Sequence, residues 1–124
     1  MNGARDFWRV RLAAAAEADF DRIVQWTAER FGHDQADVYA ETLLAALDAL
    51  KQGPTVAGVK ARDDLSRGTL MLPAARSGRR ARHVILFRVE PGRGTKIIQV
   101  LRILHDAMDL PRHLPSPPSS GDDG

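Results

Sequence analysis

RHVILFRVEPGRGTKIIQVLRIL, residues 82–104, holds two apolar segments separated by a turn. The segments 82–90 and 96–104 are rich in Ile, Val, Leu and Phe, and these residues favour strands. The PGRG sequence at 91–94 between them has the composition of a tight turn. We therefore predict that the two segments form an antiparallel hairpin.

Two other segments are predicted to extend this sheet. GTLMLP at 68–73 is a short apolar run, and WRVRL at 8–12 alternates apolar and basic residues with the period of a strand that has one covered face. Residues 55–64 have no such pattern and are predicted to be a loop.

Between the first strand and this loop the apolar period changes to that of helices. The first helical face carries Ala16, Phe20, Ile23, Val24, Thr27 and Phe31, and the second carries Ala36, Tyr39, Leu43, Leu47 and Leu50. Gly32 is predicted to cap the first helix, and Gly53 and Pro54 to end the second. The predicted fold class is α+β: an N-terminal strand, an antiparallel helical hairpin and a mostly antiparallel three-strand meander.

Length and composition bound the protein's class. A chain of 124 residues is the size of one domain, which we assign to 1–114, and the polar sequence at 115–124 is predicted to be a disordered tail. The absence of cysteine excludes disulfides and thiolate zinc sites. The start has no apolar signal segment, and no stretch is long enough to span a membrane. We expect a soluble cytoplasmic protein with no membrane partner.

Charge is unevenly distributed along the chain. Residues 1–50 hold five basic and nine acidic side chains, whereas 51–110 hold twelve basic and five acidic ones. The second half therefore predicts a basic surface that could face phosphates or an acidic partner. A solvated face of the sheet is the alternative interpretation.

The order of these signals resembles the RelE/ParE superfamily of type II toxin-antitoxin toxins over residues 8–114. The resemblance rests on Ala16, Asp19, Phe20 and Ile23, on Gly32, Ala36, Tyr39, Leu43 and Leu47, on Pro54 and Gly58, on RHVILFRV, and on IIQVLRILHDAMD. It implies a small bacterial growth-inhibiting toxin that is neutralised by a cognate antitoxin. ParE-like members of the superfamily poison DNA gyrase through protein contact, and RelE-like members cut messenger RNA on the ribosome.

Four arginines in or beside the predicted strands are the candidate contact residues for the target or the antitoxin: Arg67, Arg82, Arg88 and Arg102. Arginine can pair with carboxylates or phosphates in bidentate geometry. Arg82 and Arg88 have the same parity along their strand, so they should project from one face if no bulge intervenes.

Acid-base candidates bear on the RelE-like alternative. Cleavage of RNA needs groups that move protons and groups that stabilise the phosphorane charge. Arg82 and His105 are the catalytic candidates in that alternative. Tyr39 is predicted to be a core residue, and His83 to be half-buried with a structural role.

The stretch that follows the last strand holds four possible metal ligands: His105, Asp106, Asp109 and His113. No HExxH motif, carboxylate triad or cysteine pair accompanies them, and Leu110-Pro111 should bend the chain. We predict no metal and no cofactor. The stretch is interpreted instead as the exit of the strand, with Met108 and Leu110 packing back on the core.

Scarce lysines and the lack of a free tyrosine favour the ParE-like function, a gyrase inhibitor without chemistry of its own. The alternative is a ribosome-dependent mRNA endoribonuclease. A third possibility is an inactive relative that keeps antitoxin binding only.

Overall fold

The structure is a computed structural model that describes residues 7–106. Its elements are β1 (Arg9–Leu12), α1 (Ala14–Phe31), α2 (His33–Ala49), the 3-10 turn η2 (Leu50–Gln52), β2 (Lys60–Ala61), β3 (Leu70–Pro73), β4 (His83–Val89) and β5 (Ile97–His105). The predicted α+β fold class is confirmed. The predicted tail at 115–124 lies outside the described residues.

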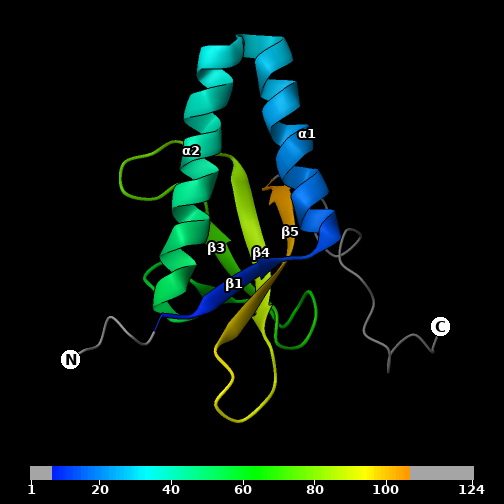
Figure 1. Ribbon diagram of the computed structural model, residues 1–124, viewed down its shortest axis with the longest axis vertical. Helices are drawn as coiled ribbons and strands as arrows, with labels where there is room; N and C mark the ends of the chain where they lie inside the picture. Colours follow the sequence, from blue (N-terminus) through cyan, green and yellow to red (C-terminus); the bar gives the residue numbers. More distant parts are fainter. Residues whose placement is uncertain (1–6, 107–124) are drawn as a thin grey trace, which may run out of the picture.

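The five strands form one mixed sheet in the order β1-β5-β4-β3-β2. β4 and β5 pair antiparallel, as their hairpin sequence predicts, and β1 runs parallel to β5 at the edge (Figure 1). The prediction of a loop at 55–64 was wrong at two positions. Lys60 and Ala61 form β2 by pairing with Met71 and Leu70. A strand of two exposed residues is too short to produce an alternating pattern in sequence.

The two helices form the predicted hairpin and cover one face of the sheet, and the tip of the hairpin extends beyond the strands (Figure 1). Gly32 makes the turn at that tip with φ 95°, a conformation that glycine adopts without strain. The core between hairpin and sheet includes fully buried Leu43, Ile85 and Phe87. Burial of these side chains is the main stabilising contribution to the fold.

Phe31 does not belong to this core, although its spacing predicts a core position. Its side chain is 63% exposed, because it lies at the end of α1 where the hairpin has passed the sheet. Helical periodicity identifies a face but does not say how far the covering sheet reaches.

The other face of the sheet carries a smaller apolar cluster. Val84, Leu86 and Leu104 are buried there beneath Leu65 and Met71, which come from the segment between β2 and β4. Within residues 7–106, neither helix has the length and apolar character that crossing a membrane requires.

Candidate functional site

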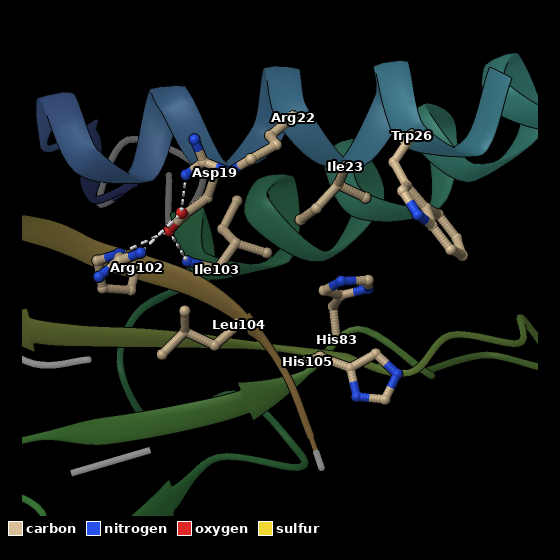
Figure 2. A pocket seen from close by; sticks show the side chains of 9 residues that line it. All are labelled: Asp19, Arg22, Ile23, Trp26, His83, Arg102, Ile103, Leu104 and His105. Atoms are coloured by element: carbon tan, nitrogen blue, oxygen red, sulfur yellow. Dashed lines mark hydrogen bonds and ion pairs between the residues drawn. The ribbon is translucent and has the colours of Figure 1, made fainter. Parts of the chain in front are cut away.

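α1 lies against the edge of the sheet at the point where β1 ends. β1 pairs with β5 only as far as Val100, so the following residues of β5 have no strand on that side within residues 7–106. The side chain of Asp19, from α1, lies against this edge and accepts a hydrogen bond of 3.0 Å from the amide of Ile103 (Figure 2). The Asp19 carboxylate thus supplies the acceptor that a neighbouring strand would provide, and it satisfies a backbone donor that is buried at this edge.

The same carboxylate holds two arginines. Arg102 donates from Nε to Oδ2 at 2.7 Å and from Nη2 to Oδ1 at 2.9 Å, and Arg22 donates to Oδ1 at 2.9 Å. Burial alone would raise the pKa of Asp19, but the hydrogen bonds from Arg102 and from the amide of Ile103 outweigh it and lower the pKa below its usual range. Asp19 is therefore a buried, ionised carboxylate that joins α1 to β5.

The structure separates Arg102 from the other candidate contact arginines. Its side chain is only 21% exposed, and its guanidinium is engaged in the bidentate pair with Asp19. Strand parity could not show this, because the partner lies on α1 and far away in sequence.

Arg67 and Arg88 lie together on the face of the sheet that the helices leave uncovered. Both are exposed, and Nη2 of Arg88 donates to the backbone carbonyl of Arg67 at 3.1 Å. A bulge does interrupt the β4-β5 ladder, between Leu86 and Phe87, but its extra residue is Leu101 of β5. β4 itself keeps its alternation.

Arg82 lies at the opposite end of β4 from Arg88. Five residues lie between them, and the six steps of extended chain from one to the other span about 20 Å. The side chain of Arg82 is 71% exposed, and its Nη2 lies 3.5 Å from Oδ1 of Asp106. The predicted set of four arginines is thus divided into an exposed pair, a single exposed residue and one residue held in a partly buried ion pair.

Three ring side chains meet near Arg82. His83 and His105 are direct partners across β4 and β5, with ring centroids 5.3 Å apart in an edge-to-face arrangement. The hydroxyl of Tyr39 lies 2.7 Å from Nδ1 of His83 and accepts a 3.0 Å hydrogen bond from the amide of Arg82. Tyr39 packs against the core as predicted, yet its hydroxyl also joins α2 to β4. A tyrosine on an apolar stripe signals such a partner, because a buried hydroxyl needs one.

Protonation is disfavoured at His83, which is half-buried as predicted. Burial, and then the neighbouring His105, lower the pKa of His83 to about 4. Burial likewise raises the pKa of Tyr39 above its ordinary value. Both groups are therefore uncharged near pH 7, and neither pKa lies close to that pH, where general acid-base catalysis is most efficient.

Stability should depend on pH through His83. Its ordinary pKa of 6.5 falls to about 4 on folding, so the unfolded chain binds the proton more readily. The stabilisation is complete above pH 6.5 and is lost as pH falls from 6.5 toward 4. After allowance for solvent screening, we expect a loss of roughly 1 to 2 kcal/mol.

The measurement is urea unfolding at several pH values of the parent protein and of His83→Gln. The parent should lose more stability than the variant between pH 7 and pH 4. His33→Gln, at an exposed position of α2, is the control and should follow the parent. Parallel curves for parent and His83→Gln would contradict the prediction.

Of the four possible metal ligands at the end of the last strand, the structure describes two, His105 and Asp106. Within residues 7–106 no group of three or more His, Cys, Asp or Glu side chains could hold a metal ion. Asp109 and His113 lie outside the described residues, as do Met108 and Leu110. The predicted exit of the last strand is described as far as Asp106.

Two grooves adjoin the His83-His105 pair. One, of about 440 Å³, lies between α1 and the end of β5, and its walls include Ile23, Trp26 and Leu104 (Figure 2). The other, of about 750 Å³, lies between the hairpin tip and the β3-β4 loop, which contributes Arg79 and Arg80. Trp26, Arg79 and Arg80 were not among the functional residues predicted from the sequence. The arginine-rich SGRRAR sequence at 77–82 was the available signal.

The chain as a whole is similar to proteins of known class. Residues 10–110 match the family described as the ParE toxin of the type II toxin-antitoxin system, parDE. The chain belongs to the ParE toxin family. It is a ParE-type toxin of a toxin-antitoxin system, and the predicted superfamily and its ParE-like branch are confirmed.

Individual relatives agree with this assignment. The chain is 35% identical over 106 residues to Toxin ParE1 of Mycobacterium tuberculosis, an alignment that covers 86% of this chain and 97% of the relative. It is 31% identical over 104 residues to Toxin ParE1 of Caulobacter vibrioides, covering 84% and 95%. A solved structure of the chromosomal ParDE TA system from P. aeruginosa has the same fold, with a TM-score of 0.63 and 22% identity over 81% of this chain and 97% of that one.

Proposed function

We propose that this ParE-family toxin inhibits growth by poisoning DNA gyrase through protein contact, without chemistry of its own. Family membership is the observation that carries the proposal, since ParE-like toxins act in this way. The pKa values of His83 and Tyr39, which both lie away from 7, agree with a protein that binds rather than catalyses. Its site of action would be the cytoplasm, where gyrase works.

Arg67 and Arg88 are the proposed target contacts. They are exposed and adjacent, so their guanidinium groups can pair with carboxylates or phosphates of the gyrase-DNA complex. Arg82 offers a further exposed cation at the other end of β4. Arg102 would contribute indirectly, by holding β5 against α1.

A cognate antitoxin is the other proposed partner. The solved structure that shares this fold comes from a ParDE toxin-antitoxin system. An acidic antitoxin segment would complement the exposed arginines of this toxin and cover its exposed apolar side chains.

A gyrase assay with purified, antitoxin-free protein tests this function. We expect loss of supercoiling and accumulation of cleaved DNA. Charge reversal of both Arg67 and Arg88 to Glu should raise the toxin concentration needed by about tenfold, equivalent to about 1.4 kcal/mol of contact energy. Arg93→Glu, an exposed position in the β4-β5 turn, is the control. No effect on gyrase from a preparation that arrests growth would refute the proposal.

The endoribonuclease alternative has one structural observation in its favour. Tyr39, His83 and His105 lie together beside exposed Arg82, so acid-base groups and a cation are adjacent. Replacing both Arg82 and His105 with alanine tests this function. If the toxin is an endoribonuclease that uses these residues, the double variant should fold but lose its toxicity. Growth arrest by the double variant would exclude the mechanism.

A further inference from the structure

One groove of this toxin has a strongly positive wall that the family assignment does not explain. The hairpin groove, as we name it, lies between the far ends of α1 and α2 and the β3-β4 loop. Its walls include Trp26, Phe31, Val38, Arg79, Arg80 and Arg82. Its volume of about 750 Å³ lies within the range of ligand sites, roughly 300 to 1,000 Å³.

The charge of the groove is of one sign. Three arginines line it and no acidic side chain does, within the described part of the chain. Arg79 donates from Nη1 to Oγ1 of Thr42 at 3.2 Å, which places the loop against α2 and leaves its remaining donors available. The guanidinium of Arg82, within the described residues, makes a long and exposed contact with Asp106. Such a wall attracts an anion that can approach several guanidinium groups at once.

The opposite wall is aromatic. Trp26 is 51% exposed and Phe31 is 63% exposed, and their rings meet edge to face with centroids 6.0 Å apart. The guanidinium carbon of Arg30 lies 5.2 Å from the centroid of the Trp26 ring, which also restrains that ring. Figure 2 shows Trp26 directed from α1 toward the sheet end where His83 and His105 lie. Restrained, exposed rings are good stacking surfaces because little entropy is lost on contact.

We propose that the hairpin groove binds a single-stranded nucleic acid, with phosphates on the arginines of the β3-β4 loop and bases against Trp26 and Phe31. A single strand has an anionic backbone along one side and flat bases along the other, and it matches the two unlike walls of the groove. Duplexes keep their bases stacked inside and offer the aromatic wall nothing to contact. Binding of this kind does not depend on which target the toxin inhibits.

The salt dependence of binding follows from the number of arginines. Three phosphate contacts on a single strand give a slope of about −2 for the logarithm of affinity against the logarithm of salt concentration. Raising salt from about 50 to about 200 mM should weaken binding about twentyfold.

The test is fluorescence anisotropy with a labelled oligonucleotide of about 12 nucleotides and the full-length, antitoxin-free toxin. Removing Arg79, Arg80 and Arg82 together by alanine substitution should weaken binding at least tenfold and flatten the salt slope. The matched control removes three exposed cations elsewhere, by Arg9→Ala, Lys60→Ala and Arg93→Ala, and should retain most of the affinity.

Trp26→Ala tests the aromatic wall and should weaken binding about tenfold, since stacking on one aromatic ring contributes about 1 to 3 kcal/mol per base. Phe7→Ala, which removes another exposed ring, is its control and should bind like the parent. Circular dichroism would show that each variant remains folded.

Three outcomes would overturn the proposal. Equal losses in the two triple variants would mean only non-specific attraction to positive charge. Equal affinity for a duplex of the same length would exclude base stacking. A polyglutamate peptide that binds as tightly as the oligonucleotide, with the same sensitivity to Trp26→Ala, would make the groove a peptide site. No gyrase or ribosome is present, so failure here is distinct from failure of the gyrase proposal.

Discussion

Replacing Asp19 with alanine is expected to lower the free energy of unfolding by about 3 kcal/mol. The substitution leaves Arg102, which is 21% exposed, without its bidentate partner and leaves the amide of Ile103 without an acceptor. Removing one member of a buried charged pair is costly because the other charge stays in a poorly solvated place. Urea unfolding at neutral pH measures the effect.

Asp21→Ala is the matched control. Asp21 lies on the same helix and is exposed, so the substitution makes the same gain in helix propensity without removing a buried contact. Its stability should stay within about 0.5 kcal/mol of the parent. Equal stabilities for the two variants would show that the Asp19 carboxylate does not hold β5 to α1.

Phe87→Ala is expected to destabilise the protein by about 4 kcal/mol. Phe87 is fully buried in the core between the sheet and the helical hairpin, and its loss removes buried apolar surface and leaves a cavity. Phe31→Ala, by contrast, should change stability by no more than about 0.5 kcal/mol, because that ring is 63% exposed.

The pair distinguishes two uses of the same residue type. In unfolding experiments only Phe87→Ala should lower the free energy of unfolding by a large amount. In oligonucleotide binding, measured where both variants are folded, Phe31→Ala should bind more weakly than Phe87→Ala. Strong destabilisation by Phe31→Ala would mean that the hairpin tip is part of the core after all.

Local signals predicted most of the fold. These signals involve residues that are close in sequence: the 3.6-residue period of the two helices, the glycine between them, and the two apolar strands around PGRG. Each of these elements formed close to its predicted bounds. Their physical cause is short-range, because one face of each element must be covered by apolar contacts. β2 escaped prediction because two residues carry no period.

The candidate site was predicted less completely. Arg67, Arg82, Arg88 and Arg102 were recognised as cations on or near strands, but parity could not show that they would lie in three different environments. Arg79 and Arg80 were overlooked because they belong to a loop, and a loop has no periodicity from which a surface can be inferred.

By itself the sequence determined the order of the elements other than β2 and most of the apolar residues that face the core, because these follow from patterns within a few residues. Its motifs, taken together along residues 8–114, also indicated the family. Only the tertiary structure decided that Asp19 pairs with Arg102 and that Tyr39 reaches His83. These contacts join residues 83 and 44 positions apart. Burial and charge at such places depend on which elements are packed together, and that packing comes from the whole chain rather than from any one segment.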